Sequence, residues 1–263
     1  MMDEIQTYLG ADGLMHCTVC KEPVEAFYPK GSLLEMRKHH RQCACEREAY
    51  AEEAQCYKEK EHRELIARNK KICFEEKEME KFTFQNVDRD SGVIRITEEY
   101  VTNWKKMKQN HMGYLFWGPV GTGKSYLAAC IANALLEQEV TVKMTNFNTI
   151  LNDLFAAEDK TEYIRSLNVY ELLIIDDLGV ERNSEYALEN IFSVIDWRYR
   201  SGRPLIITTN IPLVQLKQET KIEKKRIYDR VLERCIPVKI DGVSRREAMA
   251  NDNMQTMKNI LKI

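Results

Sequence analysis

The chain has 263 residues, of which 44% are hydrophobic and 30% are charged, and its net charge at pH 7 is −2. This composition excludes a disordered or fibrous protein, and the length predicts one large domain with a small appendage. No apolar run approaches the ~20 residues of a membrane span and the N-terminus lacks the layout of a secretion signal, so we expect a cytoplasmic protein without a membrane partner.

Residues 1–45 carry two closely spaced cysteine pairs, one C-x-x-C and one C-x-C. In the cytoplasm such pairs indicate metal ligands rather than disulfides, and their layout predicts a tetrahedral structural Zn²⁺ site. The four predicted ligands are Cys17, Cys20, Cys43 and Cys45. Because the second pair departs from C-x-x-C, His39 or His40 remains open as a replacement ligand. The alternative is four free thiols on a flexible arm.

Residues 46–81 contain neither Gly nor Pro and are dense in Glu, Lys and Arg. This composition predicts a long exposed helix, although its apolar stripe is ragged. We expect this helix to act as a charged spacer. A solvated spacer and a direct contact with a partner both remain open.

From residue 82 onward, short apolar runs alternate with helical patterns, which predicts an α/β domain built from βαβ units. The predicted strands are Tyr114–Trp117, Val140–Met144, Leu172–Asp176, Leu205–Thr208 and Ile236–Ile240. The predicted helices are Ser125–Glu137, Phe147–Ala157, Ser184–Tyr199, Ile222–Arg234 and Ser244–Leu261. The first four strands are apolar and separated by helices, so we expect them to be buried and parallel. The expected domains are therefore residues 1–45, 46–81 and 82–263.

The segment Gly118–Ser125, GPVGTGKS, fits the pattern G-x-x-x-x-G-K-[ST] in full, and it lies between a predicted strand and a predicted helix. Its glycines let backbone N–H groups point at phosphate oxygens, and the helix N-terminus adds its own donors and dipole. We expect Lys124 to reach the β- and γ-phosphates and Ser125 to hold Mg²⁺ through its hydroxyl. The predicted nucleotide-binding residues are Gly118, Pro119, Val120, Gly121, Thr122, Gly123, Lys124, Ser125 and Tyr126.

Polar side chains end two of the predicted strands. The apolar run that begins at Leu172 ends in two carboxylates, at the end of a parallel strand where phosphates and Mg²⁺ bind. We predict that Asp176 binds Mg²⁺ together with Ser125 and that Asp177 polarises the attacking water. Asn210 follows the next strand, and we expect it to hydrogen-bond that water or the γ-phosphate.

Three ordered motifs give the chain a resemblance to a known group of proteins. They are Gly118–Ser125, Leu172–Gly179 and Ile206–Asn210, with a further match at Phe82–Asn86. Over roughly residues 82–250 the chain resembles the AAA+ ATPases of the DnaC/DnaI-like replicative helicase loader group and the related IstB-like transposition ATPases. The resemblance implies a P-loop parallel sheet flanked by helices, with ATP and Mg²⁺ as cofactors and ATP hydrolysis as the activity.

The pattern of that group includes one arginine that reaches the nucleotide of a neighbouring subunit and a second that senses the nucleotide of its own subunit. The sequence YDRV resembles the first segment, so Arg230 is the expected trans-acting residue, with Arg226 as the alternative. The sequence DGVSRR resembles the second segment, with Arg246 preferred over Arg245. A guanidinium in such a position raises hydrolysis by about 10³–10⁵-fold, so we expect self-assembly into an oligomer.

The resemblance also implies the partners. Residues 1–75 correspond to the arm that docks on a DnaB-like replicative DNA helicase. Between Lys217 and Arg246 there are ten Lys or Arg against five Asp or Glu, so we expect weak, salt-sensitive, sequence-independent binding of single-stranded DNA. The predicted function is an ATP-dependent loader that delivers the helicase onto single-stranded DNA. The alternatives are an IstB-like ATPase that helps a transposase to select target DNA, and a non-hydrolysing zinc adaptor.

Overall fold

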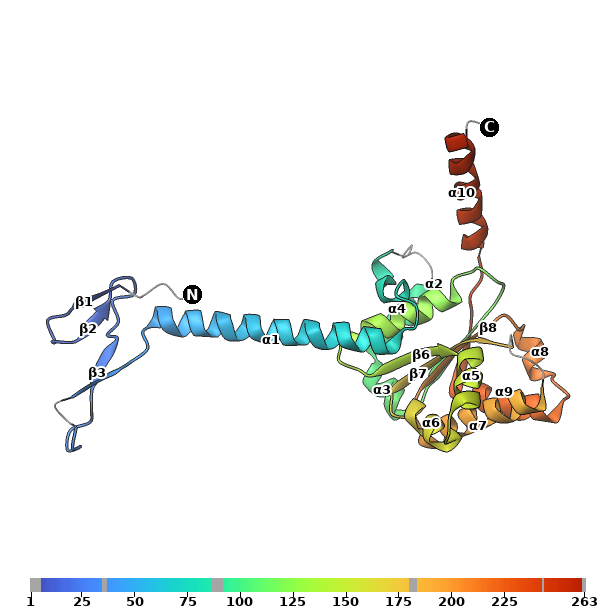
Figure 1. The fold of residues 1–263 in the computed structure, drawn as a ribbon, viewed down its shortest axis with the longest axis horizontal. Coiled ribbons are helices and arrows are strands. Elements are labelled where there is room, and N and C mark those ends of the chain that lie inside the picture. The colour runs from blue at the N-terminus through green and yellow to red at the C-terminus, as the bar shows by residue number, and fades with distance from the viewer. Residues whose placement is uncertain (1–5, 35–36, 87–91, 180–183, 243, 262–263) are drawn as a thin grey trace. The chain divides into compact units, whose positions relative to one another are not determined.

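The computed structural model describes residues 6–34, 37–86, 92–179, 184–242 and 244–261, and Figure 1 traces their course. The chain divides into two compact units, Met1–Leu65 and Ile66–Ile263. Within the described ranges, every helix is too short or too polar to cross a lipid bilayer.

The first unit contains two short antiparallel strand pairs. Strand β1 (Thr7–Leu9) pairs with β2 (Met15–Cys17), and β3 (Glu25–Phe27) pairs with β4 (Lys38–His40). The described hydrophobic side chains buried in this module are Cys17, Val24 and Cys43. An apolar core of this size is too small to stabilise a fold alone, so the module needs another source of folding free energy.

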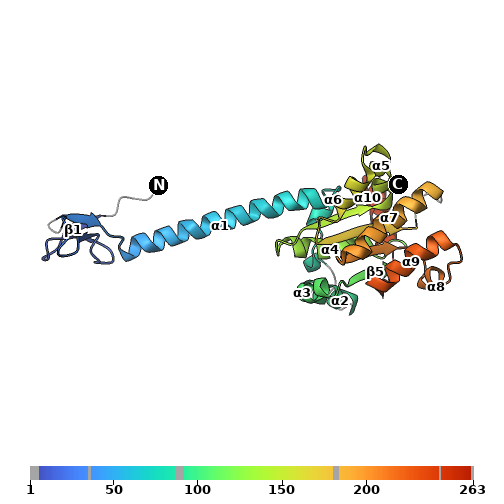
Figure 2. The same cartoon turned by 90° about the horizontal axis from the view of Figure 1, so that it is seen from below.

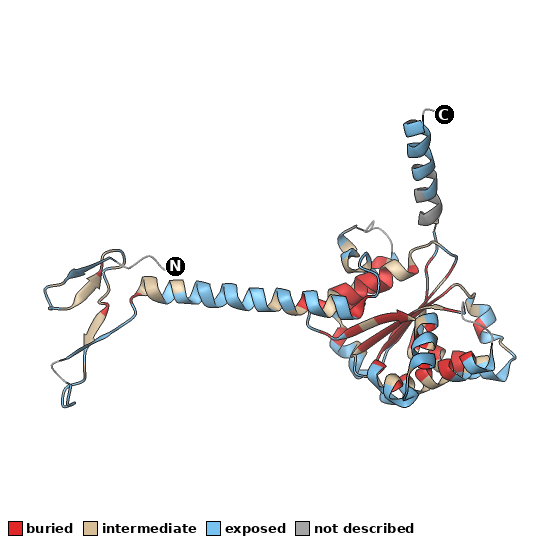
Figure 3. Ribbon diagram, viewed as in Figure 1, coloured by how far each residue is buried: buried red, intermediate tan, exposed pale blue. Residues whose placement is uncertain are grey.

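Helix α1 (Ala44–Cys73) covers most of the stretch that the sequence predicts as a charged spacer. Its buried residues are Ile66 and Cys73, and most of the remaining helix is exposed (Figure 3). The helix ends at Cys73 rather than near residue 81, which corrects the predicted extent. The cause is tertiary packing, because Cys73 and the following Phe74 are buried in the core of the second unit. Beyond them the chain forms two 3₁₀ turns, Met79–Lys81 and Phe84–Asn86.

The second unit is built on a five-stranded sheet in the order β6-β7-β8-β5-β9, and every pair of neighbouring strands is parallel. Its strands are β5 (Gly113–Trp117), β6 (Val142–Asn146), β7 (Leu172–Leu178), β8 (Leu205–Thr209) and β9 (Cys235–Lys239). All five predicted strands are confirmed, with boundaries that shift by at most two residues. The last strand is parallel like the others.

Helices cover both faces of this sheet. The predicted helices are confirmed as α4 (Lys124–Leu136), α5 (Phe147–Ala156), α7 (Glu185–Ser201), α9 (Ile222–Arg234) and α10 (Arg245–Leu261). The structure also contains helices that were not predicted, namely α2 (Gly92–Thr102), α3 (Trp104–Gln109), α6 (Lys160–Leu167) and α8 (Leu213–Lys217). Helices α2 and α4 cover one face and α5, α7 and α9 the other, onto which Figure 2 looks.

Successive residues of each strand enter different cores, as the two-residue period of a strand requires. On β7, Leu172 and Ile174 join the cluster under α2 and α4, whereas Leu173 and Ile175 join the cluster under α5, α7 and α9. A sheet covered on both faces leaves its carboxyl edge as the open site for a ligand. The phosphate loop, which is the segment Gly118–Ser125, and the two aspartates Asp176 and Asp177 both lie at that edge.

Candidate nucleotide site and metal centre

The phosphate loop connects β5 to α4 and depends on its glycines. The φ angles of Gly118, Gly121 and Gly123 are +148°, +81° and +96°, values that L-residues rarely adopt. A Cβ at Gly118 would lie 2.2 Å from the Ile240 carbonyl oxygen, and one at Gly121 would lie 2.3 Å from Ser244 Oγ. Glycine is therefore required at both positions by conformation and by packing.

The same contacts bring the end of β9 to the loop. The Ile240 N–H donates to the Trp117 carbonyl at 2.8 Å, and Ser244 then lies against the loop. The segment that carries Arg245 and Arg246 thus starts beside the phosphate loop. The side chains of these two arginines lie outside the described residues, so the sensing role of Arg246 remains a prediction.

Lys124 is the first residue of α4, and its side chain is buried within the loop. Its Nζ donates to the carbonyl oxygens of Gly118 at 3.0 Å and Pro119 at 2.7 Å. The Thr122 hydroxyl also donates to Pro119, at 3.0 Å, and Val120 is exposed at the tip of the loop. Phosphate oxygens can replace the carbonyl acceptors of Lys124, so the lysine lies where the β- and γ-phosphates of a nucleotide would bind.

Tyr126 connects α4 to the segment that resembles the group's leading motif. Its hydroxyl donates to the Thr83 carbonyl at 3.1 Å, and its ring stacks on Phe82 with centroids 4.5 Å apart. About two turns further along α4, Asn133 donates its Nδ2 to the carbonyls of Met79 and Phe82 at 2.8 and 3.0 Å. This segment is therefore held along α4, next to the phosphate loop.

The two aspartates at the end of β7 form a β-bulge. Ile175 pairs with Ile207 and Leu178 with Thr209, so Asp176 and Asp177 together oppose a single residue of β8, Thr208. Asp177 has a φ of +58°, in the left-handed region. A bulge bends the strand and re-aims its side chains. Here it directs two successive carboxylates to the same edge of the sheet instead of to opposite faces.

Thr208 holds this bulge together. Its hydroxyl accepts the Asp177 N–H at 2.9 Å and donates to Asp176 Oδ1 at 2.5 Å. Thr208 is fully buried, so neither hydrogen bond can be exchanged for one with water without local opening. The Thr208 side chain thus fixes both the backbone of Asp177 and the carboxylate of Asp176.

The electrostatics at Asp176 suit a bound cation. Burial raises the pKa of Asp176, while hydrogen bonds from Thr208 and Ser125 oppose that rise; the charge of Asp177 raises the pKa further and that of Lys124 lowers it. The Ser125 hydroxyl therefore lies close to the Asp176 carboxylate, and both are the hard oxygen ligands that Mg²⁺ prefers. The donor set fits the predicted magnesium site.

A cleft of about 500 Å³ opens beside these residues. Its lining includes Ser125, Asp176 and Asp177, the start of α5 and two residues that follow α1, namely Glu75 and Glu76. The Glu75 carboxylate accepts hydrogen bonds from the Thr145 hydroxyl at 3.0 Å and the Thr149 hydroxyl at 3.1 Å. The cleft has the size of a small-molecule site and is lined largely by polar groups.

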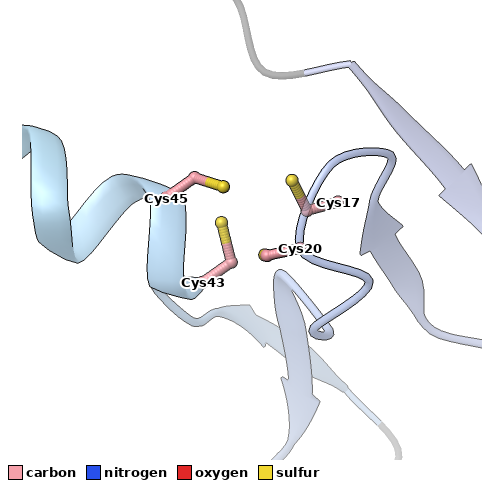
Figure 4. A group of neighbouring side chains, drawn as sticks. All are labelled: Cys17, Cys20, Cys43 and Cys45. Atoms are coloured by element: carbon pink, nitrogen blue, oxygen red, sulfur yellow. The ribbon is translucent and has the colours of Figure 1, made fainter.

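The predicted zinc ligands of the first unit converge. The Sγ atoms of Cys17, Cys20, Cys43 and Cys45 all lie within 4.8 Å of one another, and Figure 4 shows one pair at the start of α1 facing the other on the loop after β2. Sulfur atoms around a tetrahedral zinc lie about 3.8 Å apart, given Zn–S bonds of about 2.3 Å. The arrangement therefore fits Zn²⁺ with only small side-chain movements.

Neither histidine joins this cluster. His39 packs its ring on Tyr28 and pairs its Nδ1 with the His40 carbonyl, and His40 lies 3.3 Å from a Glu46 carboxylate oxygen.

Backbone N–H groups, above all that of Cys45, lower the pKa of Cys20 to about 6. Among the described residues, the group that could hold a metal ion therefore consists of the four cysteines.

The profile of the family described as "IstB-like ATP binding protein" matches residues 48–252, well over half of the chain. The chain belongs to this family. This IstB-like protein is 30% identical over 127 residues to the replicative helicase loader DnaC of Escherichia coli K12, which covers 46% of this chain and 51% of DnaC. It is 24% identical over 180 residues to the replicative helicase loader DnaI of Bacillus subtilis, which covers 62% of this chain and 58% of DnaI.

The fold of this IstB-like protein is similar to a crystal structure of DnaI. The TM-score is 0.58 at 24% identity, covering 68% of this chain and 99% of that chain. The predicted α/β class and the resemblance to DnaC- and DnaI-like AAA+ proteins are thereby confirmed. The chain spans 51% and 58% of the two curated loaders.

Two of the residues predicted to assist catalysis lie outside the cleft lining. Asn210 directly follows β8, and the contact from this strand to Asp176 comes instead from Thr208. Arg230 lies on α9, where its Nε donates to Asp196 at 2.7 Å. Since Arg230 does not line the cleft of its own chain, it contributes there only if a second copy presents it.

Thr208 and Glu75 belong to the site but were not predicted from the sequence. Thr208 stood within the Ile206–Asn210 motif, but only the register of β7 against β8 reveals that its hydroxyl bridges both aspartates. Glu75 stood in the charged stretch without a local motif. Its place in the cleft follows from long-range packing after the end of α1.

Proposed function

We propose that this IstB-like protein is an ATP-dependent loader that delivers a DnaB-like replicative helicase onto single-stranded DNA. The convergence of Ser125, Asp176 and Asp177 at one cleft, next to the loop that holds Lys124, carries the ATP-hydrolysing part of this proposal. The loader part is supported by the names of its relatives, DnaC and DnaI, both replicative helicase loaders.

The chemistry follows from the cleft. Lys124 exchanges its two carbonyl acceptors for oxygens of the β- and γ-phosphates, and the loop N–H groups neutralise further phosphate charge. Ser125 and Asp176 would hold Mg²⁺, which would supply positive charge beside the phosphates. Asp177 sits on the same bulge and orients the attacking water, with Asn210 as a second polar group at the neighbouring strand end.

A neighbouring subunit completes the site. Arg230 lies on α9 and is the cation we assign to the phosphates of a second copy, so hydrolysis rises with assembly. Arg230→Ala is expected to bind ATP normally and to lose at least tenfold of the hydrolysis that helicase and DNA stimulate. Unchanged stimulated turnover in this variant would remove the assignment.

Single-stranded DNA is proposed to bind at a groove between α5 and α7. The groove has a volume of about 560 Å³, and its lining includes Phe155 and Tyr186, which are 82% and 39% exposed. Lys160 Nζ lies 4.6 Å from the Tyr186 ring centroid. Exposed rings with a nearby cation stack bases without sequence preference. Asn148 and Asn152 line both this groove and the nucleotide cleft, so α5 borders both ligands.

This site competes with the basic stretch 217–246 as the main DNA contact. Phe155→Ala is expected to weaken binding of a labelled oligothymidine by about 1–3 kcal/mol and to leave its salt dependence nearly unchanged. Lys224→Ala, on the basic stretch, serves as the comparison, since loss of a phosphate contact mainly reduces the salt slope. A larger loss of DNA affinity in Lys224→Ala than in Phe155→Ala would show that the main DNA contact is on α9 and not at the groove.

The first unit is proposed to hold Zn²⁺ and to dock on the helicase. Four converged thiolates supply the metal site, and large apolar side chains are exposed around it: Leu9, Val19, Phe27 and Leu33. Exposed apolar residues on a metal-stabilised module are suited to a protein partner.

The test of the function is a loading reaction. The helicase is mixed with circular single-stranded DNA coated with single-strand-binding protein, and unwinding of an annealed oligonucleotide is measured. The intact protein is expected to stimulate unwinding in the presence of ATP, and Lys124→Ala is expected to bind the helicase but fail to support it. Failure of the intact protein here, together with stimulation of a transposase, would favour the transposition role.

A further inference from the structure

A row of arginines and aromatic rings joins α9 to α7, the two neighbouring helices in front in Figure 2. On α9, the guanidinium carbons of Arg226 and Arg230 lie 4.2 and 4.5 Å from the centroid of the Phe192 ring of α7. One turn further along, Arg234 lies 4.5 Å from the Tyr199 ring centroid. Contacts at these distances are favourable cation–π interactions, so this face is cationic with an aromatic base.

The carboxylate of Asp196 lies within this row. Its Oδ1 accepts Arg230 Nε at 2.7 Å and its Oδ2 accepts Arg200 Nε at 2.8 Å. The side chains of Asp196 and Arg230 are 13% and 25% exposed, whereas that of Arg200 is 74% exposed. The pair with Arg230 is therefore the shielded one, where solvent and salt weaken an ion pair least.

This pairing fixes Arg230 without exhausting its donors. A guanidinium carries five N–H groups; the one on Nε binds Asp196, and Nη1 makes a longer contact with the Arg226 carbonyl at 3.3 Å. The remaining N–H groups on the terminal nitrogens form the fork that recognises phosphate. A fork already held by a ring and a carboxylate loses little conformational entropy when it binds.

We propose that Asp196 is a positioning residue that holds Arg230 ready for the triphosphate bound to a second copy of this chain. The inference rests on the proposed function, in which Arg230 acts in trans. Without Asp196 the arginine samples several rotamers, and fewer subunits present it in the geometry that phosphoryl transfer requires. The expected result of Asp196→Ala is an approximately tenfold lower stimulated kcat with an unchanged KM for ATP, because the cleft of each chain is intact.

Mixing of subunits separates this role from a structural one. Lys124→Ala chains cannot use ATP but still offer Arg230, and Arg230→Ala chains bind ATP but offer no arginine. Mixed together with helicase and DNA, the two restore hydrolysis at interfaces where the first donates to the second. Asp196→Ala is then added either to the Lys124→Ala chain or to the Arg230→Ala chain, and the restored rate is compared.

The inference predicts loss of restored hydrolysis, about tenfold, only when Asp196→Ala is on the arginine-donating chain. Equal loss in both placements would reveal a structural effect and overturn it, and no loss in either would overturn it while the trans role of Arg230 stands. Failure of the parent mixture to restore hydrolysis would overturn the trans role itself and the inference with it. Arg200→Ala is the matched control, since it removes only the exposed partner of Asp196 and is expected to keep the rate within about twofold.

Discussion

Thr208→Val removes one hydroxyl from the β-bulge at Asp176 and Asp177 and keeps the shape of the side chain. The hydroxyl makes two buried hydrogen bonds, one from the Asp177 N–H and one to the Asp176 carboxylate. A hydrogen bond to a charged group contributes about 1.5–3 kcal/mol, and a buried N–H left unpaired costs about 1–3 kcal/mol. We therefore expect Thr208→Val to lower the free energy of unfolding by about 2.5–6 kcal/mol.

The assay is urea unfolding followed by tryptophan fluorescence, because all three tryptophans lie in the second unit, at residues 104, 117 and 197. ATP hydrolysis is measured in parallel without urea, at a temperature where both proteins are folded. Thr208→Val is expected to lose hydrolysis as well as stability, since the two carboxylates are no longer fixed to one another. The loss is expected in kcat at saturating Mg²⁺.

Thr209→Val is the matched control. The Thr209 hydroxyl is equally buried and also makes two hydrogen bonds, donating to the Leu178 carbonyl at 2.7 Å and accepting the Ile211 N–H at 3.1 Å. It contacts neither aspartate, so this variant is expected to lose comparable stability and to keep its hydrolysis. Equal loss of hydrolysis in both variants, or an unaltered midpoint for Thr208→Val, would refute the reasoning.

Three further predictions concern stability and metal binding. Burial raises the pKa of Asp176 above its ordinary value of 3.8. The contribution of Asp176 to stability is therefore fully present below that value and is lost as pH rises through the raised pKa. We expect Asp176→Asn to have a higher melting temperature than the parent at pH 7, by a difference that closes near pH 4, and to lose Mg²⁺-dependent hydrolysis. Arg198→Met should destabilise by about 3 kcal/mol in urea, because the buried guanidinium donates to the carbonyls of Tyr170, Glu171 and Pro204. In the parent we expect metal analysis to find one zinc per chain, and the double variant Cys17→Ser, Cys20→Ser should lose it. Residues 6–43 of this variant should become sensitive to protease, while the midpoint of urea unfolding followed by tryptophan fluorescence should stay unchanged.

The sheet could be predicted from the sequence because each strand is a short apolar run that ends at a motif. The run before Gly118 and the run before Asp176 are buried on both faces, so they needed no amphipathic pattern to be recognised. Among the missed helices, α6 carried a local signal: the Asp159 side chain accepts the N–H groups of Thr161 and Glu162 as a helix N-cap. Helix α8 has only five residues and no side-chain cap.

The parts of the site that could not be predicted depend on tertiary register. The sequence places Asp176 and Asp177 at a strand end, but a regular strand would point them to opposite faces. Only the two-against-one pairing with Thr208 brings both to the cleft. Likewise, no Gly or Pro marks the end of α1, because burial of Cys73 and Phe74 ends it.

Glu75 lies two residues beyond the end of α1, and its carboxylate is fastened to Thr145 and Thr149 in the wall of the cleft. The C-terminal end of this 30-residue helix is thus anchored where the γ-phosphate and its magnesium are expected. At 1.5 Å per residue the helix is about 45 Å long. A phosphate anion that enters this cleft would compete with the Glu75 carboxylate for the same two hydroxyl donors.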